Sequence, residues 1–225
     1  MPYYSQIQQD RILQEKYFFR QEIGFFVDVG AEDGKSGSNS LFFEEKGWKG
    51  ICIEPHPESF AKLKQTRKCL CLPVAISSTQ GSMTFTKIDG PASALSGLSQ
   101  SYDPRHKERI ERELQEKGGS KTEIEVPTEP LKRIFQREGV KEVHYLSIDV
   151  EGAELEVLKS IDFDEVFIHV IDIENNYPDS FGEVRKFLAS KGFTKSFPIM
   201  FDEVFVHGRS KFARLPPGLV KNLPS

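Results

Sequence analysis

Acidic residues stand at the ends of several apolar segments of this 225-residue sequence. An apolar segment fit for burial on both sides indicates a strand of a parallel sheet. The carboxyl ends of such strands share one edge, where open α/β sheets bind their ligands. Five stretches are expected at that edge: Asp28–Gly34, Glu54–His56, Ala75–Ser77, Asp149–Glu154 and Glu174–Asn176. Four of them carry a carboxylate, which suits a cationic ligand, a metal ion or sugar hydroxyls.

The first stretch lies in VDVGAEDGKSGSN, a loop rich in glycine and serine. Gly30 allows the chain to turn sharply and its backbone to approach a ligand with no Cβ in the way. The spacing of Gly30 and Gly34, G-x-x-x-G, is not the dinucleotide pattern G-x-G-x-x-G. Glu32 and Asp33 would repel a pyrophosphate, whereas a cofactor with a positive sulfonium and an ammonium would be attracted to them. A structural tight turn is the alternative interpretation.

Glu54 closes the second expected strand. An acidic side chain at this position can accept hydrogen bonds from both hydroxyls of an adenosine ribose. NAD sites use the same device, so Glu54 predicts a nucleoside without identifying it. The structural alternative is a charge that stabilises the start of the helix after Pro55 and Pro57.

Strands and helices alternate along the chain, which predicts a mostly parallel α/β sheet of about seven strands with helices on both faces. The expected strands are Gly24–Gly30, Gly50–Glu54, Cys69–Ser77, Val143–Val150 and Val166–Glu174, followed by an antiparallel hairpin of Phe193–Ile199 and Glu203–His207. The expected helices are Asn39–Lys46, Pro57–Arg67, Glu129–Glu138, Ala153–Ser160 and Phe181–Lys191. Ser82–Ile88 alternates apolar and polar residues, which predicts a half-exposed strand beside Cys69–Ser77, and Glu123–Val126 predicts a short strand returning to the sheet.

Residues 1–225 are expected to form one domain. Residues 89–120 interrupt the alternation and predict a surface excursion or lid with its own helix, which begins at Asp103-Pro104 and ends at Gly118-Gly119. Residues 1–20 are expected to form an N-terminal cap segment. Residues 209–225, with three prolines, are expected to form a surface tail.

Composition excludes several classes of protein. The net charge is −4, with Lys and Arg interleaved among Glu and Asp, so no nucleic-acid partner is expected. No apolar stretch approaches the ~20 residues of a membrane span, and the first 20 residues lack the features of a secretory signal. We therefore expect a cytoplasmic protein with no membrane partner. Cys52, Cys69 and Cys71 are expected to be reduced core residues, not metal ligands.

Three segments in this order, FVDVGAEDG, ICIEPHPESF and LSIDVEGAELEVL, resemble the FkbM family of S-adenosylmethionine-dependent methyltransferases. The segments YSQIQQD and IENN also fit this family, and the similarity extends from about Tyr4 to His207. The resemblance implies a Rossmann-like class I methyltransferase fold. Residues 89–120 and the C-terminal tail have no counterpart in the resemblance, which predicts that they contribute to the choice of acceptor.

The resemblance also implies a role for individual residues in binding S-adenosylmethionine. Asp149 would stand beside the sulfonium or the acceptor, and Ala75 and Ile76 would lie near the adenine. The complete set of expected cofactor-binding residues is Asp28, Gly30, Ser38, Asn39, Glu54, Ala75 and Ile76.

Methyl transfer to an alcohol needs alignment of the reacting groups and a means of removing the hydroxyl proton. In one scheme Asp149 or Glu151 is the catalytic base. In the other, Asp149 joins Glu151 or Glu174 around Mg²⁺, which binds the acceptor hydroxyl and lowers its pKa. The structural alternative for Glu151 and Glu154 is stabilisation of a helix start.

Candidate acceptor contacts are His106 in the excursion and the polar groups of Glu174, Asn175 and Asn176, which suit sugar hydroxyls. His56 and His106 are the two histidines placed where a base would be useful. The others, His144, His169 and His207, are expected to be structural.

The leading hypothesis is an S-adenosylmethionine-dependent O-methyltransferase acting on a sugar, glycan or secondary-metabolite hydroxyl. An NAD-dependent oxidoreductase is the second hypothesis, although the missing G-x-G-x-x-G and the two extra loop acids count against it. A non-catalytic nucleoside- or glycan-binding module of the same fold is the third. The sequence predicts no oligomeric state.

Overall fold

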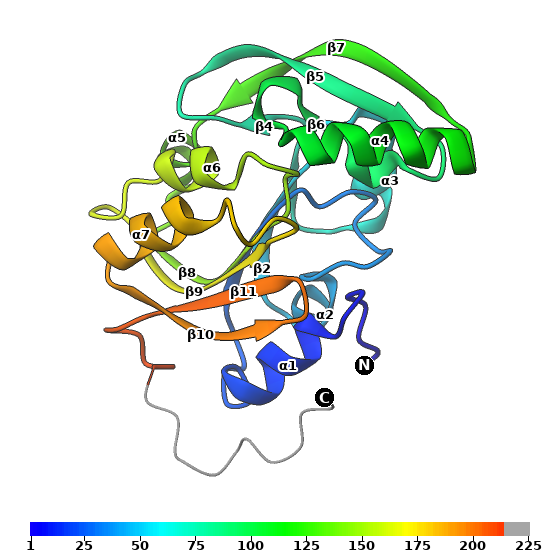
Figure 1. Cartoon of the computed structure of the whole chain (residues 1–225). Helices are drawn as coiled ribbons and strands as arrows, with labels where there is room; N and C mark the ends of the chain where they lie inside the picture. Colours follow the sequence, from blue (N-terminus) through cyan, green and yellow to red (C-terminus); the bar gives the residue numbers. More distant parts are fainter. Residues whose placement is uncertain (214–225) are drawn as a thin grey trace.

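The computed structural model describes residues 1–213, built around a seven-stranded sheet with the strand order β10-β11-β9-β8-β1-β2-β3 (Figure 1). Five neighbouring strands are parallel: β1 (Phe25–Val29), β2 (Lys49–Ile53), β3 (Leu70–Leu72), β8 (Glu142–Ile148) and β9 (Phe167–Glu174). An antiparallel pair, β10 (Phe193–Ile199) and β11 (Asp202–His207), completes the sheet beside β9. The predicted mostly parallel sheet with a C-terminal hairpin is confirmed.

The strand order reverses between β1 and β8. From β1 the chain proceeds through β2 to β3 on one side, and it later returns to the other side of β1 to form β8 and β9. Such a switch point leaves a crevice at the carboxyl ends of the strands, because the connecting loops diverge there.

Helices cover both faces of this sheet. On one face, α5 (Leu131–Glu138), α6 (Glu154–Lys159) and α7 (Gly182–Ser190) pack against alternate strand residues such as Val27 and Ile148. On the other face, α1 (Gln9–Lys16), α2 (Leu41–Glu45) and α3 (Pro57–Thr66) pack against the intervening residues, including Phe26 and Tyr145. Side chains alternate between the faces of a strand, so burial on both faces requires the near-continuous apolar runs of the sequence.

A second sheet lies above the carboxyl edge of the first (Figure 1). Its order is β4-β7-β5-β6, with β4 (Ala75–Ile76), β5 (Gly81–Asp89), β6 (Gly97–Leu98) and β7 (Ser120–Glu129). Its longest pairing is the antiparallel ribbon of β5 and β7. Short 3₁₀ turns, η1 (Ser93–Leu95) and η2 (Ser99–Ser101), precede α4 (Pro104–Lys117), which packs on this ribbon.

This second sheet corrects three sequence predictions. The expected strand Cys69–Ser77 is two strands in different sheets, separated by Pro73, which has no N–H to donate to a ladder. The expected strand Ser82–Ile88 does not lie beside it in the main sheet, because it pairs with β7. The short strand expected at Glu123–Val126 extends over ten residues and joins the second sheet.

The excursion at residues 89–120 contributes to the core, in contrast to the expected surface loop. Leu95, Tyr102 and Ile110 are buried together with Ile88 of β5. The predicted helix start is confirmed, since the Asp103 side chain accepts the Arg105 N–H at 2.9 Å. Residues 89–120 are therefore held against the second sheet by apolar contacts.

The two ends of the described chain lie on the α1 side of the sheet. Ser5 pairs with Gly37 in an isolated parallel bridge, which fixes the N-terminal segment against the loop after β1. Of the expected tail, residues 209–213 are described, and Phe212 packs on Phe18 with ring centroids 5.1 Å apart; residues 214–225 lie outside the described part. Within residues 1–213, no helix has the length and apolar character needed to cross a membrane.

Candidate functional site

Two adjacent cavities lie at the carboxyl edge of the main sheet. The first is bounded by the loops after β1, β2 and β8, by β4 and by residues 93–98, and the second by residues 101–103, the loops after β8 and β9 and the start of α7. Glu151 and Glu174 line both. The cavity volumes are about 160 and 270 Å³, so together they reach the size of a small-molecule site, roughly 300–1,000 Å³.

Gly30 forms the corner at the end of β1. Its φ is +90°, and an added Cβ would lie 1.7 Å from the Asp149 carbonyl oxygen. Gly30 lines the first cavity, but the space left by its missing Cβ is occupied by backbone of the neighbouring loop. The corner is further fixed by Asp149 N–H donating to Val29 at 2.9 Å and by Gly30 N–H donating to Ile53 at 2.9 Å.

Asp28 and the start of α2 form the floor of the first cavity. Asp28 accepts a hydrogen bond from Ser40, and its burial raises its pKa, an effect that Arg67 opposes. Ser38 Oγ accepts the Leu41 N–H at 3.1 Å. Asn39 donates to Ser147 at 3.2 Å, but its buried Oδ1 has no hydrogen-bond partner among the described residues.

Arg67 organises this floor, and sequence reasoning did not identify it. The side chain is 5% exposed and comes from the end of α3. It donates to Ser38 at 3.2 Å, to Ser40 at 2.9 Å and to the Gly34 carbonyl at 3.3 Å, and it pairs with Glu44. Arg67 thereby fixes the glycine- and serine-rich loop.

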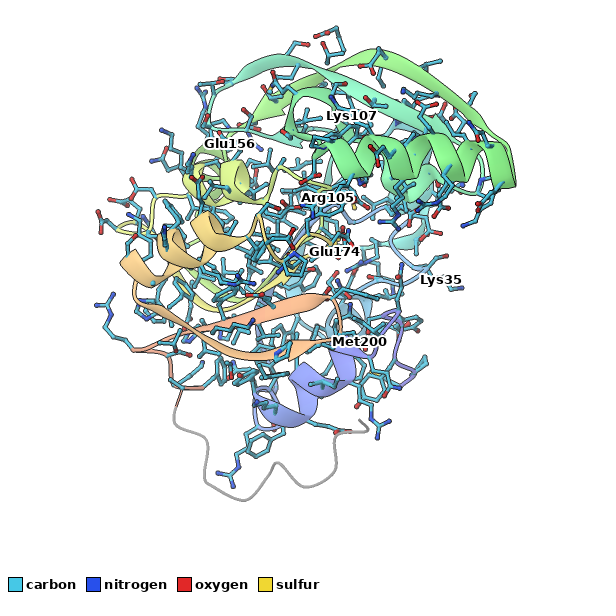
Figure 2. The ribbon with its side chains drawn as sticks, viewed as in Figure 1. Lys35, Arg105, Lys107, Glu156, Glu174 and Met200 are labelled. Carbon is cyan, nitrogen blue, oxygen red and sulfur yellow. The ribbon has the colours of Figure 1, made fainter. Side chains whose placement is uncertain are left out.

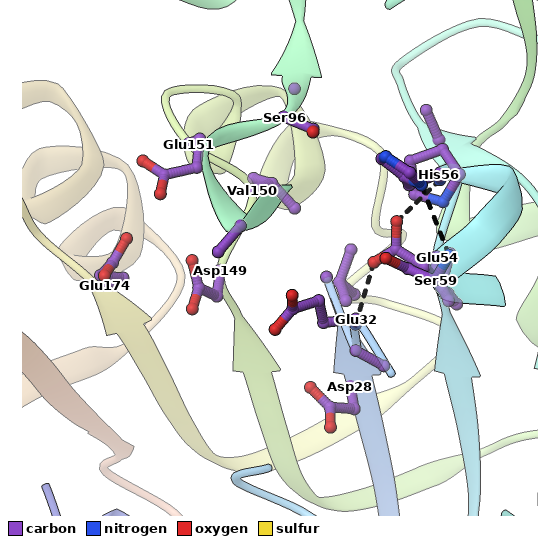
Figure 3. A pocket seen from close by; sticks show the side chains of 18 of the residues that line it. Asp28, Glu32, Glu54, His56, Ser59, Ser96, Asp149, Val150, Glu151 and Glu174 are labelled. Atoms are coloured by element: carbon purple, nitrogen blue, oxygen red, sulfur yellow. Dashed lines mark hydrogen bonds between the residues drawn. The ribbon is translucent and has the colours of Figure 1, made fainter. Parts of the chain in front are cut away.

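Glu54 is held by backbone groups at the end of β2. Its carboxylate accepts the His56 N–H at 2.7 Å and the Glu32 N–H at 2.9 Å (Figure 3). It is 6% exposed and forms no ion pair with any Lys or Arg in residues 1–213. Burial raises the pKa of Glu54 to about 7, and nearby Glu32 and Asp28 act in the same direction.

The two loop acids of the first stretch have different roles. Asp33 is turned away from the cavity, because it accepts the Lys35 and Ser36 N–H groups at 2.8 Å each. Glu32 lines the first cavity, and burial raises its pKa. His56, considered as a base, has both ring nitrogens engaged: Nε2 with the Ile88 carbonyl at 3.2 Å and Nδ1 with the Ser59 N–H at 3.4 Å.

Apolar side chains form part of the lining of the first cavity, which Glu54 also lines. Ala75 and Ile76 are 5% and 3% exposed and line the cavity with Phe85 and Leu98. This wall suits a flat heteroaromatic ring. Residues 93–98 also line the cavity. They belong to the excursion at residues 89–120, which the sequence predicted to contribute to the choice of acceptor, although no residue of 93–98 was named.

Three carboxylates meet where the two cavities join. The oxygen atoms of Asp149, Glu151 and Glu174 lie within 4.8 Å of one another (Figure 3). Burial and the neighbouring acids raise the pKa of Glu151 and of Glu174 to about 8 each and the pKa of Asp149 well above its usual range. Asn176 donates to Glu174 at 2.6 Å and to Glu151 at 3.3 Å.

Glu151 is held in an unusual backbone conformation. Its φ is +54°, in the left-handed region that costs a non-glycine residue about 1 kcal/mol or more. The next residue, Gly152, has no room for a Cβ, which would lie 2.5 Å from the Ser101 carbonyl oxygen. The excursion thus packs directly against the loop that carries Glu151.

His106 lies behind Glu151 and lines neither cavity. The ring is 1% exposed because it packs on Tyr102, with centroids 4.5 Å apart. Nε2 donates to the Leu95 carbonyl at 3.1 Å, and Nδ1 is 3.2 Å from a Glu151 oxygen. The structure therefore places this predicted acceptor residue next to a candidate base instead of on the cavity wall.

Asn175 and Glu174, which the sequence predicts as acceptor contacts, line the second cavity. The remaining predicted residues, Asp28, Gly30, Ser38, Asn39, Glu54, Ala75, Ile76, Asp149 and Glu151, all line the first cavity. The fold therefore brings the expected cofactor residues together, and the expected catalytic residues lie at the boundary between the cavities.

A family model described as the methyltransferase FkbM domain matches residues 28–195 of this chain. The match begins at Asp28 and includes every element from β2 to α7. It contains every described lining residue of the two cavities except Gln6. No curated protein matches the chain.

Proposed function

Because this chain belongs to the FkbM family of methyltransferases, we propose that it transfers the methyl group of S-adenosylmethionine to a hydroxyl oxygen of a sugar, glycan or secondary-metabolite acceptor. The observation that carries the proposal is a first cavity lined by acids with few cations to balance them. Asp28, Glu32, Glu54, Asp149 and Glu151 all have raised pKa values.

The residues of the first cavity fit this cofactor. Glu54 has a fixed carboxylate for the ribose hydroxyls, and Ala75 with Ile76 forms an apolar wall for the adenine. The unpaired Oδ1 of Asn39 needs a donor, which an ammonium group provides. When bound, the cofactor supplies a methyl carbon activated by a positive sulfur. The positive charges of the cofactor would favour ionised carboxylates around it.

The residues between the cavities would prepare the acceptor. Glu151 lines both cavities, and its pKa of about 8 is close to the range suited to a general base. We propose that Glu151 removes the hydroxyl proton of the acceptor, with Asp149 beside it. Residues 93–98 would exclude water from the first cavity, since they form part of its wall.

Removal of the proton by a carboxylate is favoured over removal assisted by Mg²⁺. The Asn176 amide donates to Glu174 and to Glu151, and the raised pKa values of Asp149 and Glu174 favour protonated carboxyls in the same cluster. These donors satisfy oxygens that a metal ion would need. Under this assignment, EDTA leaves methyl transfer unchanged, whereas a role for Mg²⁺ held by Asp149 and Glu174 predicts its loss.

The NAD hypothesis is disfavoured by the charge of the first cavity. Arg109 is the only Lys or Arg among its described lining residues, and Glu32 faces the space that a pyrophosphate would need. A fluorescence titration with NADH tests this alternative directly.

Isothermal titration with S-adenosylmethionine tests the proposal. Wild type is expected to bind, and Glu54→Ala is expected to weaken binding by about tenfold or more, the effect of losing a charge-assisted hydrogen bond. Glu58→Ala is the matched control, because Glu58 lies nearby on α3 but pairs with Lys87 at 2.7 Å on the surface. Absence of binding by the wild type would reject the proposed cofactor. A labelled-methyl transfer assay with a glycan panel then separates an enzyme from a binding module.

A further inference from the structure

The second cavity has an acidic lining. Its described lining contains no Lys, Arg or His, and its polar groups come from acids, amides and hydroxyls. Figure 2 labels Glu174 at the end of β9 and Arg105 on α4, the two elements whose ends approach each other at this cavity. The acidic lining residues are Asp103, Glu151, Glu154, Glu174 and Glu183.

Two arginines near the cavity compensate part of this charge. Arg105 pairs with Asp103 at 2.8 Å and with Asp179 at 2.7 Å, and its guanidinium lies 4.4 Å from the ring centre of Tyr177. Arg105 is therefore committed to the contact between α4 and the loop after β9. Arg109 lowers the pKa of Glu151 but lines the first cavity. The other three acids have no ion-pair partner among residues 1–213.

Asn175 independently indicates a ligand that carries a hydrogen-bond donor. Asn175 is 5% exposed, and its Nδ2 donates to Glu203 at 2.9 Å. Its Oδ1 has no hydrogen-bond partner in the described structure. Buried amide oxygens are rarely left unpaired in proteins, because each costs about 1–3 kcal/mol. Asn175 itself lines the second cavity, so a ligand donor that reached this oxygen would satisfy it.

The position of the cavity relates it to the reacting groups. Glu151 and Glu174 are shared with the first cavity, so a ligand in the second cavity can place a hydroxyl at the acids between them. Tyr102, Tyr177 and Phe181 add aromatic surface to the lining, as expected for a site that binds a ring.

We propose that the second cavity binds the acceptor and that the acceptor is a hydroxyl-bearing amine of the amino-sugar type, without any anionic group. That this ligand is the methyl acceptor rests on the proposed function. The preference for a cationic, donor-rich ring follows from the cavity alone. Phosphorylated sugars and uronic acids are disfavoured, because the described lining has no Lys, Arg or His to pair with an anionic group and carries five acids.

The test compares three ligands: the methyl glycoside of glucose and the methyl glycosides of glucosamine and glucuronic acid, each of which differs from the glucoside in one substituent. Saturation-transfer NMR measures their binding at a pH where the amine is protonated and the uronate is ionised. The glucosaminide is expected to bind about tenfold more tightly than the glucoside, and the glucuronide more weakly than either. Equal binding of the first two, preference for the glucuronide, or binding of none would overturn the proposal.

Charge reversal at the cavity edge provides a second measurement. Glu183→Lys is expected to weaken glucosaminide binding by about three- to tenfold, as a change of two charge units near a solvent-accessible site should. Glu156→Lys is the control, because Glu156 is also a first-turn acid of a helix, lines neither cavity and lies apart from Glu174 in Figure 2. An equal effect of both variants would contradict the assignment.

Titration of S-adenosylmethionine in the same samples separates this inference from the proposed function. If the cofactor binds but the glucosaminide is not preferred, the assignment of the second cavity fails alone. If the glucosaminide binds at Glu183 but the cofactor does not bind at all, the proposed methyl transfer fails and the amine site stands.

Discussion

The affinity for the nucleoside should rise with pH if Glu54 accepts hydrogen bonds from a ribose. Burial raises the pKa of Glu54 to about 7, so the free protein carries a protonated carboxyl at pH 6 and an ionised one at pH 8. Two ribose hydroxyls donate to a carboxylate, and binding therefore releases the proton. From a pKa near 7, the ionised fraction rises from about one tenth to about nine tenths over this range, which predicts about tenfold tighter binding, or about 1.4 kcal/mol.

Adenosine is the ligand of choice for this measurement. It retains the ribose and adenine but carries no sulfonium or ammonium, so the acids near Asp149 contribute little to its pH dependence. Isothermal titration in buffers of different ionisation enthalpy measures both affinity and protons released, with about half a proton expected at pH 7. The comparison with 2′-deoxyadenosine reports on one of the two hydroxyls.

Glu54→Gln supplies the matched variant, because it keeps the shape of the side chain and loses the titration. It is expected to bind adenosine more weakly at pH 8 and with no pH dependence between 6 and 8. Affinity of the wild type that is flat or decreasing over this range, or a variant that keeps the wild-type pH profile, would refute the role given to Glu54.

Three further predictions concern stability. The free energy of unfolding of the ligand-free protein should fall as pH rises from about 5 to 8. The pKa of Glu54 is about 7 in the folded state and near 4.5 in the unfolded state, so the folded state holds the proton more tightly, and this group alone accounts for a loss of about 2.5 kcal/mol over that range. Urea denaturation at stepped pH measures this loss. Gly30→Ala should lower the free energy of unfolding by about 4 kcal/mol or more, because the added Cβ meets the Asp149 oxygen. Gly139→Ala should lower it by only about 1–2 kcal/mol, because no atom lies within 4 Å of that Cβ. Equal losses in denaturant titrations would contradict this geometry. Arg67→Leu should lower the free energy of unfolding by about 3–5 kcal/mol, because it leaves buried acids unpaired, and it should also weaken cofactor binding. An unchanged melting temperature would argue against the hydrogen-bond network of Arg67 with Ser38 and Ser40.

The main sheet and its site edge could be predicted because their signals are local. Apolar runs of strand length recur between helical segments, and parallel strands buried on both faces require such runs. Once the strands are assigned, chain direction alone puts Asp28, Glu54, Asp149 and Glu174 at one edge, since parallel strands all end there. The family resemblance rests on the same segments, and the match over residues 28–195 confirms it.

The second sheet and the contacts of the excursion were decided by tertiary structure. A ribbon such as β5 with β7 joins residues far apart in sequence, and alternation within β5 does not specify which strand will pair with it. The same limit applies to Arg67, which contacts the first loop from the end of α3, and to His106, which faces Glu151 from α4. A sequence pattern reports which face of an element is buried. The partner on that face depends on packing among all elements at once, so only the folded chain identifies it.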